Sequence, residues 1–91
     1  MEVVEEIKKL CHELGEEDVV KRIDSFVALN EELESKKGRE FIEASIYGFL
    51  EGVLITLKGK ISDSQQKVKV EELLNEVRYK RKELDARFKK P

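Results

Sequence analysis

A chain of 91 residues is long enough for one small domain, and its single cysteine excludes an internal disulfide. The formal net charge is −2 although 42% of the residues are charged, which is not the strongly basic balance typical of a nucleic-acid-binding domain. We therefore expect a single helical domain over residues 1–91. Its core is thin for a monomer, and self-association is a common way for such domains to bury more apolar surface.

The charge pattern also argues against targeting to or across a membrane. Glu2, Glu5 and Glu6 occupy the region where a signal peptide carries positive charge. The longest apolar run is interrupted by Glu43 and Glu51, so it is not expected to span a bilayer. We expect a cytoplasmic protein without membrane contact. The abundance of Glu and Lys, with few Asn, Gln, Met and Cys, resembles the composition of small proteins from hyperthermophiles.

Residues 3–14 place apolar side chains at the i, i+4, i+7 spacing of an amphipathic helix, and Gly15 is expected to cap its C-terminus. Cys11 lies in the middle of the apolar stripe. We interpret it as a small buried hydrophobe, with a reactive thiol or an intermolecular disulfide as alternatives. His12 points about 100° away from Cys11, and no other Cys or His is present, so we expect a surface histidine and no metal site.

A second helix is predicted to begin near Glu16, Glu17 and Asp18, whose negative charge a helix N-terminus favours. Its apolar stripe starts at Val19 and runs to about Ser35, followed by a break at Gly38. The short connection at Gly15 predicts that the first two helices form an antiparallel hairpin. Asn30 occupies a position in the apolar stripe. We expect its side chain to bond to backbone or water, with a register-fixing role, as for Asn in coiled coils, as the alternative.

The third predicted helix runs from about Arg39 to Lys58 and contains the one long apolar stretch of the chain. On a helical wheel its charged and tyrosyl positions occupy a strip about 80° wide, which we interpret as the solvent-facing strip. These positions are Glu40, Glu43, Tyr47, Glu51 and Lys58. The opposite face carries large apolar side chains: Ile42, Ile46, Phe49, Leu50, Val53 and Leu57. A helix with so narrow a polar strip is expected to be buried and covered on about three sides.

Between these two faces runs a ridge of small residues at i+4 spacing, called here the small-residue ridge: Ala44, Gly48, Gly52 and Thr56, with Ser45 beside it. Each glycine inside a helix costs about 1 kcal/mol relative to Ala, so packing must compensate. Three interpretations are open: close packing against a helix of the same chain, a seam with a second copy, or a cleft where a ligand meets bare backbone.

A fourth helix is predicted from Asp63 to Lys89, opened by a capping box of Ser62 and Gln65. At 1.5 Å per residue it would be about 40 Å long, against about 30 Å for the two preceding helices. Its last turns should therefore overhang, and Leu84 and Phe88 should need a partner helix to cover them. Together with the small-residue ridge, this predicts a homodimer with interface residues Ala44, Ser45, Gly48, Gly52, Thr56, Leu84 and Phe88.

The basic residues of the fourth helix support an alternative function, weak binding of nucleic acid without sequence preference. They are Arg78, Lys80, Arg81, Lys82 and Arg87. Against this alternative, Glu76, Glu83 and Asp85 are interleaved with them, and no helix-turn-helix pattern is present. Positive charge near a helix C-terminus also complements the helix dipole. We therefore do not expect nucleic acid as a partner.

Two enzyme families provide further alternatives. The run Arg22-Ile23-Asp24, with Lys36, Lys37, Arg39 and Glu40, loosely resembles the all-helical chorismate mutases, which bind a dicarboxylate with several basic residues. The long first helix of that family and a further arginine along it are missing. The two ExxE pairs formed by Glu31, Glu34, Glu40 and Glu43 resemble those of all-α nucleotide pyrophosphohydrolases, whose carboxylates hold Mg²⁺. The second motif of that family ends in Asp and lies further along the chain.

The sequence therefore predicts an all-α fold: a small bundle of about four helices with a buried central third helix and a long C-terminal helix. We expect a self-associating structural or protein-interaction module, with a second copy and a further protein as possible partners. No catalytic residue, cofactor or metal is predicted.

Overall fold

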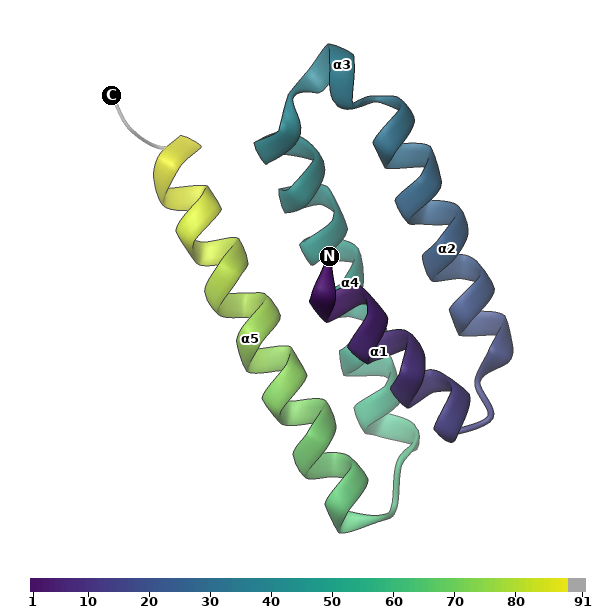
Figure 1. Cartoon of the computed structure of the whole chain (residues 1–91). Helices are drawn as coiled ribbons and strands as arrows, with labels where there is room; N and C mark the ends of the chain where they lie inside the picture. The colour runs from purple at the N-terminus through teal and green to yellow at the C-terminus, as the bar shows by residue number, and fades with distance from the viewer. Residues whose placement is uncertain (89–91) are drawn as a thin grey trace.

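The structure is a computed structural model that describes the backbone of residues 1–88 and the side chains of residues 1–87. In this part of the chain the regular elements are all α-helices, which confirms the all-α class (Figure 1). The five helices are α1 (Glu2–Glu13), α2 (Glu17–Glu32), α3 (Glu34–Lys37), α4 (Arg39–Lys60) and α5 (Ser64–Phe88).

The first helix ends where the sequence predicted. Gly15 has a φ of +74°, in the left-handed region that favours glycine. Its N–H donates to the carbonyl of His12 (3.1 Å), and the N–H of Glu16 donates to the carbonyl of Cys11 (2.8 Å). These two bonds form a Schellman motif, which satisfies the last carbonyls of α1 and turns the chain into α2. The helix pair α1–α2 is in contact, as a hairpin requires.

The second predicted helix is divided in two by the structure. α2 ends at Glu32, and after Leu33 the four-residue α3 forms a turn that leads into α4 (Figure 1). Gly38, with a φ of +86°, then separates α3 from α4, as its position in the sequence indicated. The sequence predicted one continuous helix to about Ser35, because the apolar stripe continues through Leu33 and hides the local turn.

The N-terminus of α5 is capped one residue later than predicted. The carboxylate Oδ1 of Asp63 accepts a hydrogen bond from the backbone N–H of Gln66 (2.9 Å), so Asp63 is the capping residue and Ser62 is not. Both spacings, Ser62 to Gln65 and Asp63 to Gln66, fit a capping pattern. Aspartate also brings a negative charge to the positive end of the helix dipole, which favours it over serine.

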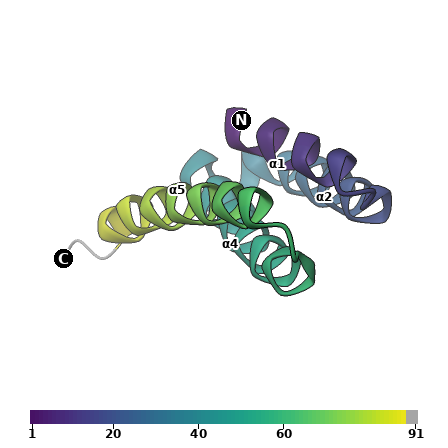
Figure 2. The ribbon, with the colours of Figure 1, turned by 90° about the horizontal axis from the view of Figure 1, so that it is seen from below.

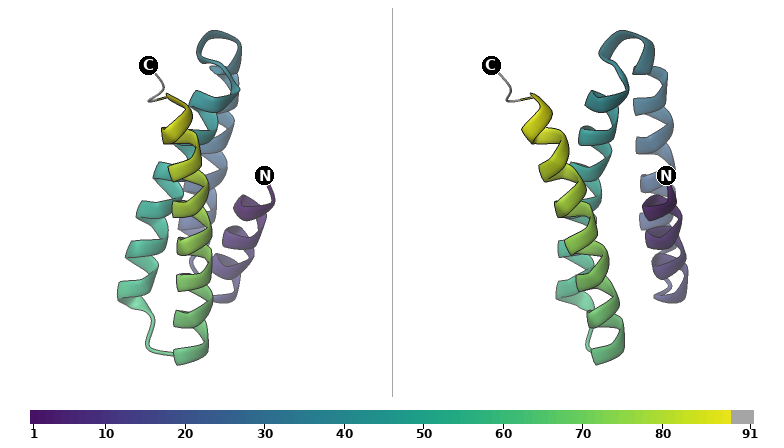
Figure 3. Two further views of the ribbon diagram at one scale, coloured as in Figure 1. Left: turned by 90° about the vertical axis from the view of Figure 1, so that its left-hand side faces the viewer. Right: turned by 60° about the vertical axis from the view of Figure 1, so that its left-hand side comes forward.

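The long helices pack around a common core. α4 contacts α5 most extensively and also contacts α2, while α1 contacts α2 and α5. Seen from below, α4 lies on the side of the molecule away from α1 (Figure 2). The left view of Figure 3 agrees, because α4 and α1 lie on opposite sides of the molecule there. One face of α4 therefore points into the core toward α1, and the opposite face points away from it.

The core contains the apolar stripes of α1, α2 and α5 and most of the predicted apolar face of α4. Ile42, Ile46, Leu50, Val53 and Leu57 are buried as predicted. Leu54, outside the predicted face, is also fully buried. Asn30 is buried, and its Nδ2 donates to the carbonyl of Phe26 (2.9 Å), which confirms the expected bond to backbone.

Cys11 and His12 also lie as predicted. The Cys11 thiol is fully buried and free, and burial raises its pKa to about 11, with Glu16 and Glu17 adding to the shift. His12 lies at the surface, where Nδ1 is 2.6 Å from Oε1 of Glu17.

The predicted overhang of the last helix is wrong for its described part. α5 has 25 residues and α4 has 22, so the two helices are nearly equal in length. Leu84 is only 5% exposed and belongs to the core of the single chain, so it needs no second copy to cover it. The side chain of Phe88 lies outside the described residues. The length predicted for α4 from the sequence was too short, because the helix continues through Gly59 to Lys60.

Candidate interaction surface on α4

The charged strip of α4, predicted to face solvent, runs along the contact with α5, where Tyr47 is buried while Glu40 and Lys58 stay exposed. Glu51 accepts hydrogen bonds from Nε of Arg78 and Nη1 of Arg81, both at 2.8 Å. Further along the helix, Lys58 pairs with Glu71 of α5 (3.0 Å). The hydrogen bond from Arg78, together with that from Arg81, holds the pKa of the Glu51 carboxyl below its ordinary value of 4.5. The strip is therefore an ion-paired contact between two helices.

Tyr47 shows most clearly that this side of α4 is covered. Its side chain belongs to the core and is only 6% exposed. Burial raises the pKa of its phenol, and the nearby carboxylates of Glu43 and Glu76 raise it further. A helical wheel assigns angles but not neighbours, so it could not distinguish a strip facing water from one facing the ion-pair partners on α5.

The small-residue ridge is the side of α4 that the single chain leaves open. Gly52 and Thr56 are exposed, and Ala44, Ser45 and Gly48 are half-buried. A Cβ at Gly48 would lie 3.6 Å from Nη1 of Arg81, and a Cβ at Gly52 would have nothing within 4 Å. No backbone of another helix in the described chain approaches these glycines. Close packing against another backbone of the described chain therefore does not explain Gly48 and Gly52, whereas Ala44 packs partly against the core.

A shallow apolar groove runs beside the small-residue ridge, between α2 and α4. Its centre is the stacked pair Phe26–Phe49, whose ring centroids are 4.2 Å apart with planes 11° from parallel. Arg22 and Phe49 line both halves of the groove, which we call the α2–α4 groove. Its other lining residues are Lys21, Ser25, Phe26 and Leu29 on one half and Gly48, Gly52, Val53 and Thr56 on the other.

Large apolar side chains stand exposed along this side of the molecule. Leu29 on the groove is 59% exposed, and on α4 Phe41 and Ile55 are 48% and 49% exposed. Phe41, Gly48, Gly52 and Ile55 fall within about 60° of one another around the helix. Exposed apolar residues are ordinary singly, but several on one side of a molecule beside an apolar groove favour an interaction surface.

The sequence identified only part of this surface. Its periodicity marked the small residues but assigned Phe26 and Phe49 to the core, where they do pack partly. The exposure of Leu29, Phe41 and Ile55 depends on where α1 lies, and the sequence pattern does not contain that information. The one available signal is Ile55, a large apolar residue on the same side of the helical wheel as Gly48.

The basic residues of α5 do not form one free basic face. Arg78 and Arg81 are bound to Glu51, and Nη1 of Arg87 lies 3.9 Å from Oε1 of Glu40. Lys80 and Lys82 form no ion pair with the described residues. Because they are two positions apart on a helix, their side chains point in directions about 160° apart. The arginines thus stabilise the α4–α5 contact, which is a role the sequence did not predict.

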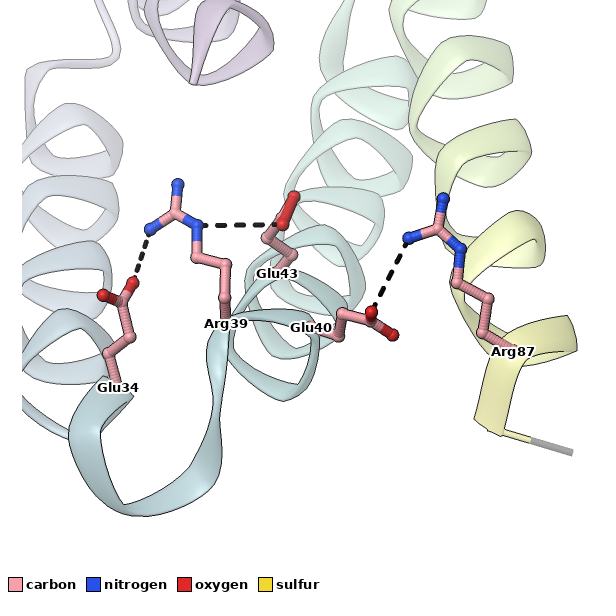
Figure 4. A network of polar contacts seen from close by, with 5 residues as sticks. All are labelled: Glu34, Arg39, Glu40, Glu43 and Arg87. Atoms are coloured by element: carbon pink, nitrogen blue, oxygen red, sulfur yellow. Dashed lines mark hydrogen bonds and ion pairs between the residues drawn. The ribbon is translucent and has the colours of Figure 1, made fainter. Parts of the chain in front are cut away.

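The carboxylates of the two ExxE pairs lie near the N-terminus of α4, around α3. Oε1 of Glu34 is 2.6 Å from Nη1 of Arg39, and Oε1 of Glu43 is 3.7 Å from its Nε (Figure 4). Glu40 points instead toward Arg87. Arg39 therefore lies between two of the four carboxylates. Among the described residues, no three His, Cys, Asp or Glu side chains are grouped so that they could hold a metal ion.

The residues that resemble chorismate mutase are also divided between two sites. Arg39 and Asp24 line a cavity of ≈ 270 Å³ between α1, α2 and α4, whereas Arg22 lines the α2–α4 groove. Within the cavity Lys8 is already paired, because its Nζ is 2.6 Å from Asp24 and 3.4 Å from Glu5. The hydrogen bond to Asp24 is the main cause of the raised pKa of Lys8. This cavity offers no free cluster of basic groups for a dicarboxylate.

Within residues 1–88, none of the helices has both the length and the apolarity needed to cross a membrane.

Comparison with known proteins assigns the family but no activity. The structure is similar to the crystal structure of a singleton protein, PF1176, from P. furiosus, with 49% sequence identity and a TM-score of 0.83. The match covers 92% of this chain and 88% of that one. The comparison with curated proteins finds no match. Residues 4–91 match the family model described as protein of unknown function (DUF3216). The chain is therefore a small helical member of the DUF3216 family, whose function is uncharacterised.

Proposed function

We propose that this protein is a cytoplasmic protein-interaction module that forms a homodimer through the outer face of α4 and the adjoining α2–α4 groove. In this proposal the four long helices form one bundle, and that bundle presents the surface. The observation that carries the proposal is the exposure of Phe41, Ile55 and Leu29 around an open run of small residues.

The free-energy cost of the glycines in α4 supports the binding of a second chain at this surface. Gly48 and Gly52 each lower the stability of α4 by about 1 kcal/mol relative to Ala. Beside Gly48 lies the side chain of Arg81, whereas in the described chain nothing lies within 4 Å of a Cβ placed at Gly52. Close approach of a second helix would compensate, because bare backbone allows the two helix axes to come nearer than larger side chains would. Burying exposed Phe41, Ile55 and Leu29 would contribute roughly 1.5–3 kcal/mol for each side chain fully buried.

Sedimentation velocity over a range from micromolar to hundreds of micromolar tests the proposal. We expect the mass to rise from 10.6 kDa toward twice that value as the concentration increases. Replacing Ile55 by Asp should keep the chain monomeric over the whole range, without loss of helical content, because the side chain is half exposed in the single chain.

A matched control is Tyr79→Asp, which places the same charge at a 65% exposed apolar position on α5. It should associate like the wild type. A wild-type chain that stays at 10.6 kDa throughout would overturn the homodimer, and equal effects of the two substitutions would overturn the assignment to this face.

A further inference from the structure

The exposed apolar residues of α4 are placed symmetrically about Gly48. Phe41 lies seven residues before it and Ile55 seven residues after it, which is about 10 Å in each direction along the helix. The two side chains differ by about 40° around the helix, so they share its outer face. The residues between them on this face, Ser45, Gly48 and Gly52, are small. The face therefore has a large–small–large pattern that stays the same when the direction of the helix is reversed.

Such a pattern matches an isologous interface, in which a two-fold axis brings the same patch of two copies together. If the axis passes near Gly48 and the two α4 helices run antiparallel, Phe41 meets the partner's Ile55. The same contact is repeated by symmetry at the other end, and the small residues meet at the centre. A parallel arrangement would instead place Phe41 on Phe41 of the partner subunit and Ile55 on Ile55 of the partner subunit.

The charges on α2 favour the same antiparallel arrangement. Phe26 stacks on Phe49, so the middle of α2 lies level with Gly48 of α4. The residue of α2 at that level is Val27. Arg22 lies five residues before Val27 and Glu32 lies five residues after it. Both are exposed, and neither forms an ion pair with the described residues. A two-fold axis at this level brings Arg22 toward the partner's Glu32.

We propose that the second copy binds antiparallel across the outer face of α4, centred on Gly48, with Phe41 against the partner's Ile55 and Arg22 paired with the partner's Glu32. This inference rests on the proposed homodimer and adds its geometry. Its support is the symmetric placement of two exposed apolar side chains together with two opposite charges that have no ion-pair partner among the described residues. The small residues alone do not carry it.

Cysteine cross-linking tests the direction of the two helices. The native Cys11 is fully buried, so a single introduced cysteine is the reactive one. Phe41→Cys and Ile55→Cys should each form little disulfide-linked dimer alone, whereas an equimolar mixture of the two should cross-link. Gly48→Cys should cross-link with itself. Tyr79→Cys is the control for random collision, because its exposed position lies on α5.

The possible results separate this inference from the proposed function. Self-linking of Phe41→Cys would show parallel helices and overturn the antiparallel geometry while self-association stands. If the wild type sediments as a dimer but the α4 cysteine variants cross-link no faster than Tyr79→Cys, the outer face of α4 is not the interface. A wild type that is monomeric at all concentrations would overturn both proposals.

A charge exchange tests the contact between Arg22 and Glu32. Arg22→Glu alone and Glu32→Arg alone should each weaken dimerisation by about tenfold or more, because each places like charges opposite one another twice. Mixing the two variants should restore the affinity, since both contacts of the mixed dimer again join opposite charges. Lys82→Glu changes the net charge as Arg22→Glu does, and should leave the affinity unchanged. Failure of the mixture to recover would overturn this contact.

Discussion

The inner and outer faces of α4 differ in the residues they carry, although they belong to one helix. The inner face has Ile46, Leu50 and Leu57, each at most 2% exposed, and it anchors the core. The outer face has glycines and half-exposed Phe41 and Ile55. The inner residues are explained by the single chain alone. The glycines of the outer face lower the helix propensity of α4. The comparison therefore locates the residues that stabilise the single chain on the inner face, and the surface of the proposed interaction on the outer one.

The largest expected effect is on the inner face. Leu50→Ala should lower the free energy of unfolding by about 2–5 kcal/mol, because it removes a fully buried side chain and leaves a cavity. Ile55→Ala on the outer face should change it by less than about 0.5 kcal/mol. Urea denaturation of both variants, at a concentration where the chain is monomeric, measures the difference. Similar losses for both would remove the distinction between the two faces.

The ion-paired flank of α4 should show an intermediate effect that depends on pH. The pKa of Glu51 is lower in the folded chain than its ordinary value of 4.5, so the charged carboxylate stabilises the fold above that value. This contribution is lost as the pH falls through the folded pKa. Glu51→Gln should therefore cost about 1 kcal/mol at pH 7, and the difference from wild type should disappear in acid.

The control for this prediction is Glu72→Gln, since Glu72 of α5 is exposed and forms no ion pair with the described residues. It should change the free energy of unfolding little at either pH. A Glu51→Gln variant whose difference from wild type persists unchanged below pH 4.5 would show that the ion pairs are not its cause.

A smaller effect, of opposite sign, is expected from the glycines of the outer face. Gly52→Ala should raise the free energy of unfolding of the monomer by about 0.5–1 kcal/mol, because the methyl group meets nothing within 4 Å and alanine favours the helix. Gly15→Ala should lower it, because φ is +74° there. Thermal unfolding distinguishes the two. A destabilised Gly52→Ala monomer would mean that this face is packed within the chain.

The smallest effect is expected from the basic residues of α5 that have no ion-pair partner in the described chain. Lys80→Gln combined with Lys82→Gln should leave the free energy of unfolding within about 0.5 kcal/mol of wild type. Fluorescence anisotropy with a labelled oligonucleotide measures any binding, and we expect neither form to bind. Binding by wild type that the double variant loses would favour the nucleic-acid alternative and weaken the interpretation of the outer face.

Much of the fold was predictable because local signals decide it. Gly15 and Gly38 end helices by their conformation, and the apolar stripes define the core. The break between α2 and α3 was missed, because Leu33 keeps the periodicity across it. The capping residue of α5 was placed one position early, because Ser62 and Asp63 both satisfy the same spacing.

The surface was less predictable, because it depends on contacts between distant segments. Periodicity showed that α4 has a charged strip and a small-residue ridge, but not which of them another helix covers. The answer depends on Arg78 and Arg81, which lie 27 and 30 residues after Glu51 in the chain. Long charged side chains at the flank of a helix can reach a neighbour as easily as water, so their presence alone does not identify a solvent-facing side.

The single thiol of Cys11 can report local opening of the folded chain. Because the sulfur is enclosed and its pKa is about 11, an alkylating reagent can modify it only when α1 swings away from the remaining helices. The labelling rate therefore measures how often α1 separates from the other helices. Since that segment lies across the molecule from the outer side of α4, pairing of two copies there should leave the rate almost unchanged.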